Sequence, residues 1–209
     1  EALEAENDAL KQRILDMQED VRTDQELQRE NKRYEQLLGF ADQHEDFVFE
    51  PAYIISWDAS SYRSSFTIGK GTNHGLEIGM CAITENGQVV GLITDAGVNW
   101  ATVTTILDNG LEISASIASS GYSGMVTGGY STGQEGYLRL NYLPSSAVIR
   151  NRDQVVTAGS TVYPRNLILG YVVDAGIGDT GVAKYAVLEP AADIHNLEQV
   201  FILTNYAQE

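Results

Sequence analysis

The chain has a single cysteine, Cys81, among 209 residues. One cysteine cannot form an intramolecular disulfide, and it cannot supply the two or four thiolates of a structural zinc site. Basic side chains are also scarce, since 13 lysines and arginines stand against 29 acidic residues, a formal charge of −16. Phosphate backbones repel such a chain, so its composition argues against general nucleic-acid binding, and an anionic membrane surface would not attract it.

Long apolar runs are absent too. The longest apolar clusters, Val89–Ile93 and Leu167–Val173, are interrupted by glycine and fall well short of the roughly 18 residues that a membrane-spanning helix needs. The sequence shows no signal-peptide pattern and begins at Glu1 in the middle of a heptad. We therefore expect that an upstream segment with a transmembrane anchor precedes this sequence, and that the fragment itself contacts a membrane only through it.

Glycine and proline are both missing from residues 1–38, while all 20 glycines lie in 39–209. Residues 1–38 are rich in strong helix formers. Steps of three and four residues place six side chains on one heptad seam: Leu3, Asn7, Leu10, Ile14, Met17 and Val21. A buried asparagine in such a seam fixes register and strand number. The pattern predicts a helix that ends near Gly39 and forms a parallel homodimeric coiled coil through this seam.

Two alternatives stay open for this helix: it could pack along its own globular domain, or it could fray in isolation. The seam also changes phase. Asp24 and Gln28 interrupt it, and apolar residues resume one position out of step at Leu27, which indicates a local change in supercoiling.

From Pro51 onward the pattern changes to short apolar runs and period-two alternation separated by glycine, which is typical of β-strands. Asn86-Gly87 and Asn109-Gly110 are both hairpin signals. Twelve strands are expected: 52–57, 64–69, 80–84, 88–96, 102–106, 112–117, 123–129, 136–142, 154–158, 168–173, 185–189 and 199–203. No long helical stretch separates them, so barrels or a sandwich are favoured over a parallel sheet.

The fold class is therefore mainly β, with a long N-terminal α-helix followed by two small β-barrel domains. We place the coiled-coil helix at 1–39, the first barrel at 40–120 and the second at 121–209, because 118–124 is small and polar. A strand could still cross between the barrels. Open sheet edges would also permit self-assembly by edge pairing.

One enzyme hypothesis needs weighing. His74, Asp95 or Asp108, and Ser123 in a Gly-Tyr-Ser-Gly loop follow the order of trypsin-like two-barrel serine hydrolases. The spacing argues against it, because those enzymes place a whole barrel between histidine and serine. The three histidines have no metal-ligand spacing, Gly69-Lys70-Gly71 lacks the helix of a phosphate-binding loop, and Cys81 fits a buried inert thiol. We predict no catalytic residues, no cofactor and no metal.

Three stretches resemble the rod shape-determining MreC family, and together they cover nearly the whole chain. The first is the helix end 30–40 followed by 52–55. The second is 68–80 with 86–91. The third is 153–159 with 163–164, 170–172 and the tail 189–193. The sequence departs from the family pattern at Arg152, where glycine is usual, and at Arg165-Asn166, where Pro-Gly or Pro-x-Gly is frequent.

The resemblance implies a non-enzymatic, extracytoplasmic scaffold of bacterial cell elongation that dimerises through its coiled coil and is anchored by a single transmembrane helix. It implies a class B penicillin-binding protein as direct partner and a link through MreD to the MreB system. The alternatives are a trypsin-like two-barrel serine hydrolase or its inactive descendant, and a secreted coiled-coil adhesin or fusion-type module.

Tyrosine is enriched at binding hot spots, so the tyrosines of the second domain are candidates for the partner surface. Tyr130, Tyr137 and Tyr163 are the ones we select. Tyr142 and Tyr171 also lie in this region, but they fit strand-core positions equally well.

Overall fold

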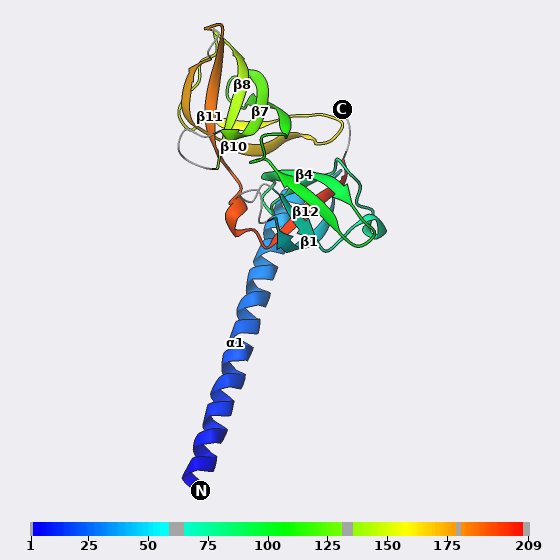
Figure 1. Ribbon diagram of the computed structural model, residues 1–209, viewed down its shortest axis with the longest axis vertical. Coiled ribbons are helices and arrows are strands. Elements are labelled where there is room, and N and C mark those ends of the chain that lie inside the picture. The colour runs from blue at the N-terminus through cyan, green and yellow to red at the C-terminus, as the bar shows by residue number, and fades with distance from the viewer. Residues whose placement is uncertain (1, 59–64, 131–135, 179–180, 207–209) are drawn as a thin grey trace. The chain divides into compact units, whose positions relative to one another are not determined.

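The computed structural model describes residues 2–58, 65–130, 136–178 and 181–206 (Figure 1). It divides into two units, Glu1–Gln43 and His44–Glu209. The first unit contains the helix and the second contains all of the strands, and each unit is described separately below.

The first unit is a single α-helix, α1 (Ala2–Ala41), of 40 residues. The predicted helix is confirmed, and it ends two residues beyond Gly39. The helix runs through this glycine, and the amide of Asp42 still donates to the carbonyl of Leu38 at 2.8 Å. A glycine inside a helix costs only about 1 kcal/mol, so the helical residues on either side outweigh it.

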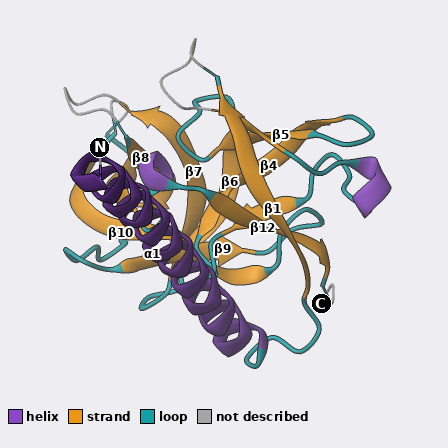
Figure 2. Ribbon diagram, turned by 90° about the horizontal axis from the view of Figure 1, so that it is seen from below, coloured by secondary structure: helices purple, strands orange, loops and turns teal. Residues whose placement is uncertain are grey.

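The strands of the second unit form two closed six-stranded barrels. Barrel 1 contains five strands from the first half of the unit and the last strand of the chain, in the order β1-β12-β3-β4-β5-β2. Its strands are β1 (Val48–Trp57), β2 (Ser65–Ile68), β3 (Cys81–Ile83), β4 (Val89–Ala96), β5 (Ala101–Thr105) and β12 (Gln199–Asn205). A 3-10 turn, η1 (Thr72–His74), lies between β2 and β3. Figure 2 shows β1 beside β12 and β4 beside β5.

Barrel 2 is built from six consecutive strands, in the order β10-β11-β8-β7-β6-β9. They are β6 (Glu112–Ile117), β7 (Ser123–Tyr130), β8 (Tyr137–Pro144), β9 (Gln154–Ala158), β10 (Arg165–Ile177) and β11 (Ala183–Pro190). A second 3-10 turn, η2 (Ile194–Asn196), follows β11. All twelve predicted strands are therefore present within the described residues, and the expected fold class is confirmed.

The barrels are divided differently from the expected boundary at residues 120 and 121. Strand β6 pairs with β7 and β9 and so belongs to barrel 2, whereas β12 pairs with β1 and β3 and so returns to barrel 1. The crossover that the sequence left open is thus real. Asn86-Gly87 does form the β3–β4 hairpin turn, but a hairpin at Asn109-Gly110 is wrong, because that segment joins β5 to β6 in the other barrel.

Both barrels are closed, and this affects how the protein could self-assemble. Each described strand pairs with a neighbour on both sides, so the open edges expected for edge-to-edge assembly are not present. A closed barrel removes the unpaired backbone groups that edge pairing needs.

Large apolar side chains fill both barrels. The largest fully buried ones in barrel 1 include Phe66, Ile68 and Phe201, and those in barrel 2 include Ile113, Leu138 and Leu140. Burial of each such side chain contributes about 1.5–3 kcal/mol to folding. The barrels also touch: the Ile168 amide donates to the Gly87 carbonyl at 3.3 Å, and the Tyr206 hydroxyl donates to the Ser160 carbonyl at 3.3 Å.

Candidate functional site

The helix presents an uncovered apolar seam. Leu10, Ile14, Met17 and Val21 are each more than half exposed, and Asn7 is exposed as well. The side chain of Leu3 lies outside the described residues. Within a single chain these side chains are exposed to water, and a second helix would bury them in a coiled coil. The dimer stays a prediction that this geometry permits.

The loop between β2 and β3 carries the glycine-rich stretch that the sequence singled out. A β-carbon at Gly71 would collide with the Gly97 carbonyl oxygen and with the backbone of Trp100, so only glycine fits there. Gly75 and Gly79 adopt φ of 76° and 94°, which favours glycine. Leu76 is fully buried. These glycines therefore have a structural role: Gly71 lets the loop lie against the β4–β5 turn, and Gly75 and Gly79 allow its backbone to turn.

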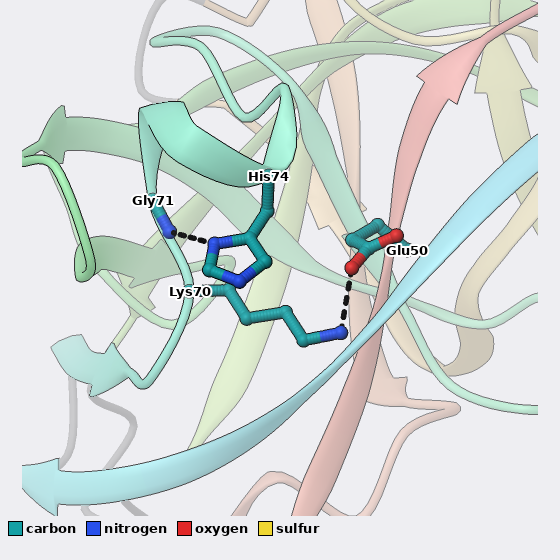
Figure 3. Close-up of polar contacts among 4 residues, drawn as sticks. All are labelled: Glu50, Lys70, Gly71 and His74. Atoms are coloured by element: carbon teal, nitrogen blue, oxygen red, sulfur yellow. Dashed lines mark hydrogen bonds and ion pairs between the residues drawn. The ribbon is translucent and has the colours of Figure 1, made fainter.

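One ion pair anchors this loop to β1. Lys70 Nζ lies 2.6 Å from Glu50 Oε1, and both side chains are about 30% exposed (Figure 3). Next to it, Nδ1 of His74 accepts a hydrogen bond from the Gly71 amide at 3.5 Å. The contact of His74 is thus local to its own turn.

The catalytic triad of the hydrolase alternative is not assembled. His74 lies in the β2–β3 loop of barrel 1, whereas Ser123 begins β7 in barrel 2, where its hydroxyl donates to the Gly121 carbonyl. The carboxylates of Asp95 and Asp108 accept hydrogen bonds from the nearby amides of Ala96 and Gly110. Each group is bonded within its own turn, so the order of residues along the chain does not become a site.

Two other features concern reactive side chains. Within the described ranges no three His, Cys, Asp or Glu side chains are grouped so that they could hold a metal ion. Cys81 is fully buried in β3, and burial raises the pKa of its thiol to about 12. A thiol that stays protonated is a poor nucleophile.

No helix in the described part of the chain is long and apolar enough to cross a membrane.

The selected tyrosines are not equivalent. Tyr163 is only 6% exposed, and its hydroxyl accepts a hydrogen bond from the Ser114 amide at 2.7 Å, so the surface position expected for it is wrong. Tyr137 begins β8 and is half-buried, while the side chain of Tyr130 lies outside the described residues. Burial of Tyr163 follows from the bond between its loop and β6, which the local sequence does not reveal.

Sequence reasoning passed over the tyrosine that is most exposed among the described residues. Tyr142 in β8 is 75% exposed, and its φ of 64° is in the left-handed region that non-glycine residues rarely adopt. It is therefore not a strand-core residue. Holding a tyrosine in that conformation costs about 1–2 kcal/mol. Tyr142 lies where the β8–β11 register shifts, between the pairs Leu140–Ala186 and Leu143–Lys184.

Tyr142 is one of several exposed apolar residues that lie toward one end of barrel 2. Four large side chains there are each more than half exposed, and we call them the end patch: Tyr142, Val148, Ile177 and Val182. Strand pairing brings them to the same end, because Ala183 pairs with Pro144 and Ile177 pairs with Lys184. Lys184 Nζ also donates to the Ala147 carbonyl at 2.8 Å, beside Val148. Figure 1 shows β8, β10 and β11 together in this barrel.

The end patch left almost no signal in the sequence. Its members come from a strand, two loops and a strand end, so no periodic pattern connects them. The one sequence signal near the patch is Gly181, a glycine next to Val182. In the structure Gly181 has a φ of 69° in the turn that leads to β11.

These observations define the class: a double-barrel protein with an N-terminal helical arm and exposed apolar surfaces suited to binding. The sequence model of the family described as "Rod shape-determining protein MreC, barrel core" matches residues 54–204. The chain belongs to the MreC family.

Relatives in this family are named cell shape-determining proteins. The chain is 25% identical to MreC of Listeria monocytogenes over 206 residues, covering 97% of this chain and 69% of that protein. It is 27% identical to MreC of Haemophilus influenzae over 157 residues, covering 75% of this chain and 43% of that protein.

Solved structures share the fold. The structure of MreC from Listeria monocytogenes has a TM-score of 0.71 at 23% identity, covering 97% of each chain. A complex between penicillin-binding protein PBP2 and MreC from Helicobacter pylori includes a chain with a TM-score of 0.60 at 16% identity, covering 76% of this chain and 98% of that one.

Proposed function

We propose that this chain is a non-catalytic scaffold of the bacterial cell-elongation machinery that binds a class B penicillin-binding protein through barrel 2. The end patch is the observation that carries this proposal. Isolated exposed apolar residues are ordinary, but four gathered at one end of a barrel form the kind of surface that marks a protein-binding site. The structural neighbour from Helicobacter pylori, described as a complex between PBP2 and MreC, supports the class of partner.

The chemistry of the patch fits a protein partner. It joins a rigid aromatic anchor, Tyr142, with three branched aliphatic side chains, and tyrosine is enriched among residues whose truncation costs binding energy. Aliphatic side chains bury apolar area at about 25 cal/mol per Å² without leaving a polar group unpaired. Tyr137, and Tyr130 beside it in the β7–β8 pairing, remain a second proposed contact at the other end of β8.

The remaining parts of the proposal concern assembly and location. We propose that two chains associate through Asn7, Leu10, Ile14, Met17, Val21 and the seam position Leu3, which would display two copies of barrel 2. An extracytoplasmic location, a membrane anchor and a link through MreD to the MreB system follow from the family resemblance. An apolar seam with more than half of each leucine and isoleucine exposed supports the dimer.

The proposal can be tested in cells. The gene would be replaced by wild type, by Val182→Asp in the end patch, or by Val48→Asp, an exposed valine of β1 in barrel 1 that serves as a matched control. We expect rod shape and co-purification of the penicillin-binding protein with wild type and Val48→Asp, and loss of both with Val182→Asp at equal protein level. Normal shape and co-purification with Val182→Asp would contradict the surface, and normal shape after deletion of the gene would contradict the function.

A further inference from the structure

The turn between β4 and β5 is held rigidly at the surface of barrel 1. The Gly97 amide donates to the Trp100 carbonyl at 2.8 Å, which closes the turn. The β2–β3 loop fixes it from the side, because the amides of Thr72 and Asn73 donate to the carbonyls of Gly97 and Val98 at 2.9 and 3.1 Å. Side chains on this turn are therefore presented in a fixed arrangement.

Trp100 is the central side chain of this surface. A β-carbon at Gly97 would collide with the pyrrole atoms of the indole, which means that the ring lies directly over this glycine. The residue is nevertheless 41% exposed, and Val98 beside it is 59% exposed. The indole thus rests on backbone on one side and keeps apolar surface open to solvent on the other.

Two amide side chains of this turn and the adjoining loop are bonded to each other. Asn73 Nδ2 donates to Asn99 Oδ1 at 3.2 Å, and both residues are exposed. This bond leaves the Nδ2 donors of Asn99 and the Oδ1 acceptor of Asn73 without a partner among the described residues, and the same holds for the indole N–H of Trp100. The turn and the adjoining loop therefore carry free amide donors, a free amide acceptor and an exposed aromatic ring.

We propose that Asn73, Val98, Asn99 and Trp100 form a binding platform for a neutral saccharide. One face of a pyranose ring consists of C–H groups, which can cover the open indole surface, while its hydroxyls each donate and accept hydrogen bonds. An adjacent donor and acceptor match a pair of neighbouring hydroxyls. None of the four side chains is charged, so the platform has no group that would select an ionic ligand, and Val98 can contact the methyl of an acetamido substituent.

The rigidity of the turn matters for such a shallow site. A small surface contact gains little free energy, so any cost of ordering the protein would remove it. The closed turn, the loop contacts and the ring seated on Gly97 mean that little ordering remains to be done on binding.

Fluorescence provides a direct test, because the chain has only two tryptophans. Trp57→Phe leaves Trp100 as the single tryptophan, so tryptophan emission then reports Trp100 alone. Trp57 packs on Phe66 with ring centroids 4.9 Å apart, and phenylalanine keeps an aromatic ring at that position. We would titrate this variant of the full chain with a tetramer of N-acetylglucosamine and, separately, with a tetramer of glucose. A saturable change in Trp100 emission with either oligosaccharide is the expected result.

Affinities would be compared by chemical-shift titration of amide NMR signals. Asn99→Ala should weaken binding about ten-fold, the effect of losing about 1.4 kcal/mol of hydrogen bonding. Trp100→Ala should abolish binding, while Trp100→Phe keeps a ring and should retain part of it. Tyr142→Ala and Val182→Asp, both in barrel 2, serve as controls and should bind like wild type.

Absence of a saturable response to both oligosaccharides would overturn the proposal. So would equal affinity of wild type, Asn99→Ala and Trp100→Ala, which would place binding elsewhere. If Trp100→Ala disturbs the turn, Asn99→Ala and Trp100→Phe still decide the question, because each changes only one contact.

Discussion

Removal of a single oxygen atom from Tyr163 should measurably destabilise barrel 2. Tyr163 is buried, and its hydroxyl accepts the hydrogen bond of the Ser114 amide at 2.7 Å across 49 residues of sequence. Tyr163→Phe keeps the ring in place and removes the acceptor. An unpaired buried donor costs about 1–3 kcal/mol, and because Ser114 is only half-buried we expect the lower part of this range, about 1–2 kcal/mol.

Urea unfolding is the appropriate assay. With a slope of about 2 kcal/mol per M, this loss lowers the midpoint by about 0.5–1 M. Both tryptophans lie in barrel 1, so their fluorescence reports that barrel, whereas far-ultraviolet circular dichroism reports both. The last strand of barrel 1, β12, follows all of the strands of barrel 2 in the sequence, so the chain links the two barrels twice. We therefore expect the two signals to shift together.

Tyr142→Phe is the matched control, since it removes the same atom from a tyrosine that is 75% exposed. It should change the free energy of unfolding by no more than about 0.5 kcal/mol. Equal stability of Tyr163→Phe and wild type would refute the assignment of Tyr163 as a buried structural residue and would reopen its candidacy for partner binding.

Three further predictions concern the helix, barrel 1 and the thiol. Leu10→Asp with Ile14→Asp should shift sedimentation equilibrium toward monomer, and a wild type that is already monomeric at high concentration would exclude the coiled-coil dimer. Gly91→Ala should destabilise the second unit by about 2–3 kcal/mol in thermal unfolding, because its β-carbon would collide with the Thr104 carbonyl; Gly39→Ala, where nothing lies within 4 Å, should strengthen the helix instead. Burial raises the pKa of Cys81 from 9.0 to about 12, so the folded state holds this proton more tightly than the unfolded state. The resulting stability is complete below pH 9.0 and is lost as the pH rises toward 12, and Cys81→Ala should flatten this decline in urea midpoints measured across that range. A decline that is as steep in Cys81→Ala would assign it to other groups.

The local elements could be predicted because their signals are local. Alternation of apolar residues or a short apolar run marked each strand, and Asn86-Gly87 marked the β3–β4 turn, where Gly87 has a φ of 74°. The strand ends were less certain: β10 spans Arg165–Ile177, well beyond the expected 168–173. Its extension depends on pairing with β11, which is set by the neighbouring strand and not by its own residues.

Long-range pairing was the part that sequence reasoning could not reach. The return of β12 to barrel 1 follows from its ladders with β1 and β3, and no pattern within 199–205 identifies those partners. The same limit applies to the tyrosines. Tyr142 and Tyr163 have similar polar and apolar neighbours along the chain, yet a left-handed backbone exposes one and a bond to Ser114 buries the other.

Isothermal titration of the extracytoplasmic part of a class B penicillin-binding protein with this chain tests the central claim most directly. Wild type and Val48→Asp should bind with the same affinity, because Val48 lies in barrel 1 and outside the end patch. Val182→Asp places a charge in the end patch and should weaken binding at least about ten-fold, equivalent to about 1.4 kcal/mol. No binding by wild type, or equal binding by wild type and Val182→Asp, would contradict the proposal that barrel 2 holds the synthase through its end patch.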